Sequence, residues 1–232
     1  MTPTKIAPPI EKNTVLNPKI WDHDHLKGAV KGALLRIAED FVKYVDVPFE
    51  VVDIVITGGN ANYNYTTHSD IDLHIITDYA SIECDRTAAE LFDTKRLMYK
   101  RDYDVTIHDI PVELYVEDQD TPAVSGGSYS ILKDQWINKP NPNIPDYDEK
   151  EVKHMVQVWH EVFKHAVQTG DLQACRKSVQ LLRKYRQMGL DTPEAEFSTA
   201  NLVYKSLRND STLKGITTII DRLHDRELSL GQ

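Results

Sequence analysis

The sequence predicts an α/β domain, a small mixed β-sheet with flanking helices, followed by a C-terminal helical bundle. Three observations carry this prediction. Between residues 49 and 118, short β-branched or alternating segments are interrupted by one long segment of helical period. After residue 146, apolar residues recur only at helical spacing. The proline-rich stretch at 138–150 separates the two patterns and predicts a boundary. We therefore expect three parts: a flexible N-terminal arm (1–20), an α/β domain (21–145) and a helical domain (146–232).

The elements of the α/β domain follow from apolar spacing, in chain order. Residues 25–45 carry a wide apolar stripe of helical period, which Pro48 ends. The β-branched run 49–57 and the alternating run 69–77 predict two strands. The remaining elements are a helix over 81–100, a hairpin over 103–118 that turns at His108-Asp109, and a partly strand-like segment at 129–137.

The helical domain and the N-terminal arm show opposite patterns. The domain has four apolar stripes of helical period, at 152–167, 172–182, 197–207 and 213–223. Short connections between the stripes favour antiparallel neighbours in a small bundle. The first 20 residues hold four prolines and no clear period, so we expect them to be flexible.

Composition limits the class of protein. The chain has 232 residues, 41% of them hydrophobic and 27% charged, which is typical of a globular protein with a sizeable core. No apolar run approaches the ~20 residues of a membrane span, and the N-terminus lacks a secretory signal, so we expect a cytoplasmic protein with no membrane partner. Cys84 and Cys175 lack metal-ligand spacing and are expected to be reduced core residues.

A net charge of −9 argues against a strongly basic nucleic-acid-binding surface, although nucleotides whose phosphates are balanced by metal ions stay possible as ligands.

Three carboxylates are the candidate chemical groups. Asp70 and Asp72 are two residues apart on a predicted strand and therefore point to the same face. Glu113 lies on a later strand, between the inward-facing Val112 and Leu114. If the two strands are close, the three acids converge, and like charges would raise one another's pKa. Divalent cations would remove that penalty, and Mg²⁺ prefers such oxygen ligands.

Two glycines precede the acids at the end of a predicted strand. Gly58 and Gly59 would let the backbone approach a phosphate closely, at a point where a short helix could begin. The same stretch of chain could therefore hold a polyphosphate beside the carboxylates.

This arrangement, Gly58-Gly59, Asp70-Ile71-Asp72 and then Glu113, resembles the DNA-polymerase-β-like nucleotidyltransferase superfamily. The stretches ANYNYTTHSDIDLHII and YSILKDQWI are also similar to predicted nucleotidyltransferases of tailed phages. The resemblance implies that the catalytic domain is 21–145, that Asp70, Asp72 and Glu113 hold two Mg²⁺ ions, and that Glu113 helps to activate an acceptor hydroxyl. It also implies a nucleotide site that includes Gly58, Gly59 and Ser69. The chain departs from the pattern at Thr57, where relatives usually have an apolar residue, and at Gly59, where many have serine.

The implied reaction moves a nucleoside monophosphate from a nucleoside triphosphate, such as ATP, to an acceptor hydroxyl and releases pyrophosphate. The acidic net charge favours a small molecule or a protein as acceptor. A basic cluster on a predicted helix keeps RNA or tRNA as an alternative: Arg176, Lys177, Arg183, Lys184 and Arg186. A non-catalytic nucleotide-binding module is the third hypothesis. We expect the active cleft between the two domains, and the host cytoplasm as location if a phage encodes the chain.

Several residues have competing interpretations. Asp104 and Glu117 are rivals of Glu113 for the third carboxylate, and His74 could shape the floor of the site. Tyr129 could stack on a base. The DHDH run at 22–25 invites a metal site, but its aspartates are better explained as N-terminal helix caps.

Overall fold

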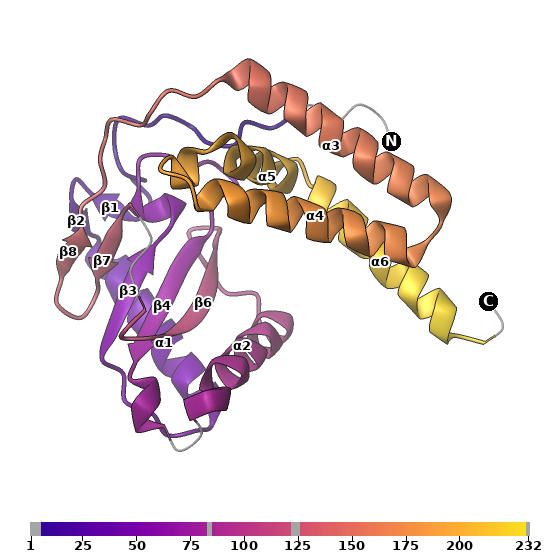
Figure 1. The fold of residues 1–232 in the computed structure, drawn as a ribbon. Coiled ribbons are helices and arrows are strands. Elements are labelled where there is room, and N and C mark those ends of the chain that lie inside the picture. Colours follow the sequence, from indigo (N-terminus) through magenta and orange to yellow (C-terminus); the bar gives the residue numbers. More distant parts are fainter. Residues whose placement is uncertain (1–5, 83–84, 122–125, 231–232) are drawn as a thin grey trace. The chain divides into compact units, whose positions relative to one another are not determined.

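The computed structural model describes residues 6–82, 85–121 and 126–230 (Figure 1). The chain forms two compact units. The first runs from Glu11 to Ile144. The second joins the helical part that begins at Pro145 to the N-terminal segment that ends at Ile10.

A six-stranded mixed sheet is the centre of the first unit. Its strand order is β5-β6-β4-β3-β7-β8, and β4 pairs in parallel with β6 while the other neighbours are antiparallel. A separate two-stranded hairpin precedes it. The strands are β1 (Trp21–Asp22), β2 (His25–Leu26), β3 (Asp53–Thr57), β4 (Ile71–Thr77), β5 (Thr106–Ile107), β6 (Ile110–Asp118), β7 (Ser128–Ser130) and β8 (Gln135–Asn138).

Helices α1 (Gly28–Val45) and α2 (Asp85–Asp102) complete this unit with two short 3₁₀ turns, η1 (Gly59–Ala61) and η2 (Tyr79–Ser81). The alternation expected for β4 is present, because Ile71, Leu73 and Ile75 are fully buried while the residues between them are half-buried. The buried face of β4 belongs to one apolar cluster with residues of both helices, among them Phe41 and Phe92. The opposite face of the sheet therefore carries the polar side chains.

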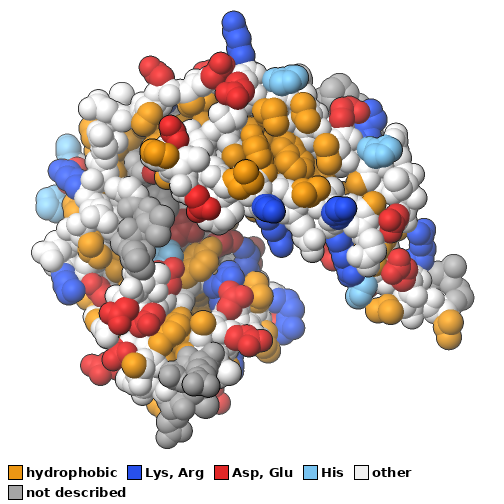
Figure 2. All heavy atoms as spheres, in the orientation of Figure 1, with side chains coloured by type: hydrophobic (Ala, Val, Ile, Leu, Met, Phe, Trp, Pro, Cys, Tyr) orange, Lys and Arg blue, Asp and Glu red, His pale blue; other side chains and the backbone are white. Residues whose placement is uncertain are grey.

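The second unit contains four helices, α3 (Glu149–Thr169), α4 (Leu172–Leu190), α5 (Thr199–Asn209) and α6 (Thr212–Leu228), and a 3₁₀ turn, η3 (Ala195–Phe197). Asp148 caps α3 by accepting hydrogen bonds from two backbone N–H groups, and Gly170 ends it in a left-handed conformation. The apolar stripes predicted from the sequence form the core of this unit. Four apolar side chains on α3 and α4, however, are exposed: Val158, Val162, Leu181 and Met188. Figure 2 shows apolar side chains gathered where Figure 1 draws these helices.

The mixed α/β class, the hairpin turn at His108-Asp109 and the four C-terminal helices are as predicted. Among the described residues, no helix combines the length and the apolar character that a membrane span requires.

The N-terminal segment differs from the flexible arm that we expected. Leu16 and Ile20 are buried in the core of the first unit, and the Asn13 side chain donates to the Tyr63 and Tyr65 carbonyls. In the second unit, the Pro8 carbonyl accepts from the Asn209 side chain. The apolar residues of this segment have no period because it forms no regular element, so local spacing could not reveal their burial.

The DHDH run also differs from its expected role. It forms the β1–β2 hairpin, in which Asp22 pairs with His25 and His23 has a positive φ of 54°. Helix α1 begins only at Gly28, so Asp22 and Asp24 are not helix caps.

Candidate functional site

The pairing of β4 with β6 brings the candidate acids together. Asp72 on β4 lies directly opposite Glu113 on the parallel strand β6, and Asp70 immediately precedes β4. Each of these three carboxylates offers an oxygen within 4.8 Å of the other two, and all three side chains are half-buried. Three hard oxygen donors at this spacing fit a divalent cation such as Mg²⁺. The chemistry of the donor set could therefore accommodate the metal expected from the sequence.

Gly58 makes room for one of these carboxylates. Its backbone has a φ of 75°, and a Cβ added at this position would lie 1.8 Å from Asp72 Oδ2. Only glycine avoids both the steric overlap and the unfavourable backbone conformation. The residues that follow form η1, a single 3₁₀ turn rather than a longer helix. The glycine turn and the acid on the next strand are thus one packed unit.

Ser69 and Gly59 also face each other. A Cβ on Gly59 would lie 3.1 Å from Ser69 Oγ. That hydroxyl oxygen accepts a hydrogen bond from the Thr66 backbone N–H, at 2.9 Å. Ser69 therefore helps to fold the loop before Asp70, and its hydroxyl can still donate to a further acceptor.

Asn60 is a residue of this region that sequence reasoning missed. Its side chain is fully buried and donates to the Ser69 and Asp70 carbonyls, at 3.2 and 2.7 Å. It also accepts from the Asn17 side chain, at 2.8 Å. Asn60 thereby joins the glycine turn to the backbone of the first acid. Its place immediately after two glycines was the available signal, but a single asparagine in a loop has no pattern of its own.

Glu113 is held by two donors that the sequence did not single out. The Lys100 ammonium contacts its Oε1, and the Tyr115 hydroxyl donates to its Oε2 at 2.9 Å. Burial by itself raises the pKa of Glu113, but these two hydrogen bonds and the charges of Lys100 and Arg96 outweigh it, so the net pKa is lowered. Glu113 is consequently ionised at neutral pH.

His74 explains the unusual Thr57. The His74 ring joins the Thr57 hydroxyl, 2.9 Å from Nε2, to the Glu117 carboxylate, 3.1 Å from Nδ1. Within the described part of the chain, the contact between His74 Nδ1 and Glu117 does not have hydrogen-bond geometry. The ring also stacks on Tyr115, with centroids 4.8 Å apart. A threonine at position 57 therefore completes a polar row across the sheet.

The rival carboxylates lie outside the group of three. Glu117 is engaged with His74, and this contact lowers its pKa against the effect of burial. Asp104 is exposed and lines a hollow of about 160 Å³ that Glu113 also lines. Among the described residues, the acidic groups close enough to share one cation are Asp70, Asp72 and Glu113.

Other candidates have structural roles. Tyr129 is 1% exposed, donates to Asp134 and packs edge-on against Trp21, so the prediction that it stacks on a base is wrong. Cys175 is a buried, reduced core residue as predicted, whereas Cys84 lies outside the described residues. In the basic cluster, Arg186 is engaged within the second unit, since it donates to Asn201 and covers the Tyr204 ring.

Comparisons with known proteins add little. No protein-family model matches the chain, and no curated protein matches it in sequence. A solved structure that resembles it is the STING-associated CdnE c-di-GMP synthase from Capnocytophaga granulosa, which is 11% identical, with 87% of this chain and 83% of that chain covered. The TM-score of 0.23 is too low to carry an argument. The interpretation of the site therefore rests on its own geometry.

Proposed function

We propose that the protein is a Mg²⁺-dependent nucleotidyltransferase, which moves a nucleoside monophosphate from a nucleoside triphosphate to an acceptor hydroxyl. The observation that carries this proposal is the meeting of Asp70, Asp72 and Glu113 within 4.8 Å of one another, with Asp72 packed against Gly58. The acids come from two segments of the chain and carry like charges, and Lys100 offsets part of their repulsion at Glu113. Divalent cations would offset the rest, so the convergence of the acids supports a metal-dependent reaction on a polyanion.

The proposed roles follow from the positions of the side chains. Asp70, Asp72 and Glu113 would hold two Mg²⁺ ions, which when bound neutralise phosphate charge and orient the reacting oxygens. The backbone at Gly58 and Gly59 and the hydroxyl of Ser69 would contact the triphosphate. The acceptor oxygen bonds to the α-phosphorus, and the bond from that phosphorus to the bridging oxygen breaks. Pyrophosphate leaves, and the ionised Glu113 carboxylate takes the hydroxyl proton.

We favour a small molecule or a protein over a nucleic acid as acceptor, because the chain is acidic overall. One observation supports RNA as a second candidate. Lys177, Arg183 and Lys184 are exposed along α4 and could contact phosphates. RNA binding through these side chains would weaken steeply with added salt, whereas transfer to a neutral small molecule would not.

Substitution of single acids tests the proposal. We expect Asp72→Asn to weaken binding of Mn²⁺ with a non-hydrolysable ATP analogue by at least roughly 10-fold, and pyrophosphate release by roughly 100-fold or more. Calorimetry and a labelled-ATP assay with cell lysate as acceptor source measure the two effects. The fold should persist, because the variant removes like-charge repulsion in the metal-free protein.

Asp104→Asn is the matched control, since Asp104 is a nearby exposed acid outside the group of three. It should bind and turn over nucleotide like the unmodified protein. Unchanged nucleotide binding and turnover in Asp72→Asn would overturn the proposed function.

A further inference from the structure

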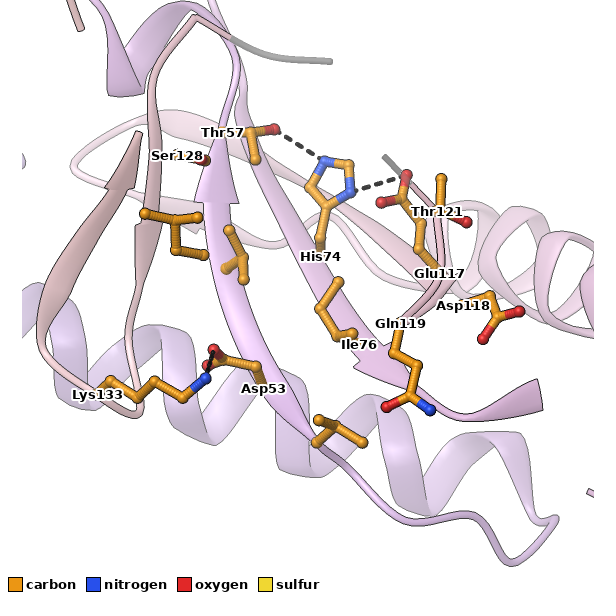
Figure 3. A pocket seen from close by; sticks show the side chains of 13 residues that line it. Asp53, Thr57, His74, Ile76, Glu117, Asp118, Gln119, Thr121, Ser128 and Lys133 are labelled. Carbon is orange, nitrogen blue, oxygen red and sulfur yellow. Dashed lines mark hydrogen bonds and ion pairs between the residues drawn. The ribbon is translucent and has the colours of Figure 1, made fainter. Parts of the chain in front are cut away.

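A cavity of about 470 Å³ lies in the first unit (Figure 3). Strand alternation places its lining on the face of the sheet that carries Asp72 and Glu113. Val55 and Thr57 of β3 and His74 and Ile76 of β4 line it, alternating with the residues that face the helices. Its volume falls within the range of small-molecule sites. The residues proposed above to bind the metal ions and the triphosphate do not line this cavity.

One end of the cavity adjoins the carboxylates. Thr57 is the register partner of Asp72, and His74 lies two residues beyond Asp72, about 7 Å along the same face. The His74 ring stacks on Tyr115, whose hydroxyl donates to Glu113. A molecule in the cavity would therefore have one end against His74, and the Tyr115 ring behind His74 leads to Glu113.

A buried hydroxyl in the cavity wall lacks a partner among the described residues. Ser128 is 1% exposed and lines the cavity, and its Oγ has no hydrogen-bond partner in the described part of the chain. Burying a hydroxyl without a partner is unfavourable, so a ligand group that pairs with it would gain affinity. The neighbouring Ser130 differs in this respect, because its hydroxyl donates to Asp53.

The charges around the cavity select against anions. Lys133 is paired with the buried Asp53, 3.2 Å away, so its charge is compensated. The acidic groups of the lining, Asp53, Glu117 and Asp118, outnumber its cations, which are Lys133 and, when protonated, His74. The rest of the lining is largely apolar and includes Val55 and Ile76. An anionic ligand would meet repulsion here, whereas an apolar body that is neutral or positively charged would not.

We infer that this cavity is the acceptor site, and that it takes a neutral or cationic small molecule with an apolar body and a hydroxyl directed toward Glu113. The inference rests on the proposed function and narrows the class of acceptor that the enzyme would use. RNA, a polyanion, does not fit the charge of this cavity.

Three compounds with one aromatic ring but different charge test the inference. The probes are 2-phenylethanol, 2-phenylethylamine and phenylacetate, titrated at constant ionic strength and neutral pH into protein with labelled Ile and Val methyl groups. We expect the alcohol and the amine to shift the methyl signals of Val55 and Ile76, and phenylacetate to bind at least 10-fold more weakly. Equal or tighter binding of phenylacetate, or no shift with any probe, would overturn the inference.

Two serine variants test the role of the unpartnered hydroxyl. Ser128→Ala should leave the melting temperature unchanged, since no hydrogen bond of this hydroxyl within the described residues is lost, and should weaken 2-phenylethanol binding severalfold. Ser178→Ala is the control, because Ser178 is a buried serine of the second unit, whose hydroxyl donates to the Cys175 carbonyl. Identical probe binding in the two variants would contradict the proposed contact.

Asp72→Asn separates this inference from the proposed function. Asp72 does not line the cavity, so the variant should lose nucleotide affinity while keeping probe binding. Nucleotide binding without any probe response would overturn the acceptor site alone. If the unmodified protein binds the probes but does not bind nucleotide, the transferase proposal is overturned, and the acceptor role with it.

Discussion

At Gly58, the absence of a side chain decides whether the Asp72 carboxylate can occupy its place. The positive φ of 75° and the distance of only 1.8 Å between an added Cβ and Asp72 Oδ2 both require glycine there. Backbone conformation and lack of space thus both explain why the first residue of the Gly58-Gly59 pair is glycine. At Gly59 the backbone is less constrained, and the nearest atom to an added Cβ is the Ser69 hydroxyl oxygen, 3.1 Å away.

Gly58→Ala should therefore displace Asp72. We expect a loss of about 1–3 kcal/mol in the free energy of unfolding, from backbone strain and steric overlap, and weaker binding of Mn²⁺ with nucleotide. Urea unfolding and calorimetry measure the two effects.

Gly215→Ala provides the contrast, because a Cβ at this position of α6 meets no atom within 4 Å. That variant should gain up to about 1 kcal/mol from helix propensity and keep nucleotide affinity. A Gly58→Ala protein as stable and as competent as Gly215→Ala would contradict the requirement for glycine.

At the scale of elements, the loop from β3 to β4 is a folded structure rather than a flexible connection. Asn60 at the centre of η1 binds the two carbonyls before β4 and the side chain of Asn17. Its own carbonyl accepts from the Trp21 indole, at 2.7 Å. The loop is thereby joined to the N-terminal segment, and the position of Asp70 depends on both.

Asn60→Ala should destabilise this loop. It removes two donors and leaves the buried Asn17 amide without that acceptor, which costs about 1–3 kcal/mol. We also expect weaker nucleotide binding, because the backbone at Asp70 is no longer held. Asn141→Ala, in the exposed segment after β8, is the control. It removes only an exposed hydrogen bond from the Asn143 backbone N–H, so it should cost less stability than Asn60→Ala and leave nucleotide affinity unchanged. Loss of stability with unchanged nucleotide affinity would show that Asn60 does not position Asp70.

At the scale of the whole molecule, the candidate site belongs to one unit. The three carboxylates, the glycine turn and the cavity all lie between Glu11 and Ile144. The second unit has its own apolar core and capped helices. The expectation that the active cleft lies between the two domains stays a prediction.

Hydrogen exchange, measured with and without Mg²⁺ and a non-hydrolysable ATP analogue, tests two predictions: that the site lies in the first unit, and that the active cleft lies between the two domains. We expect increased protection in the segment from Thr57 to Asp72 and around Glu113, because bound ligand stabilises the folded state of its own site. Additional protection in α3–α6 is expected if the second unit forms the other wall of the cleft. Protection confined to the second unit would contradict the assignment of the site to the first unit. Removal of the metal with EDTA should abolish the protection that nucleotide binding causes.

Immediate neighbours in the sequence do not determine the roles of Tyr129 and the DHDH run. Tyr129 packs against Trp21, far away in the chain, and the DHDH run forms the β1–β2 hairpin. No local pattern marks Lys100 or Ser128, because Lys100 contacts Glu113 on another element and Ser128 lines a cavity formed by several strands.

Local periodicity was sufficient to predict the order and type of most elements, and to place Asp70 and Asp72 on one face, because alternation along a strand is a property of consecutive residues. The parallel register that sets Glu113 opposite Asp72, the burial of Leu16 and Ile20, and the cavity beside His74 were decided only by the tertiary structure. Each depends on pairing between segments far apart in the chain, and such pairing leaves no periodic trace in either segment alone.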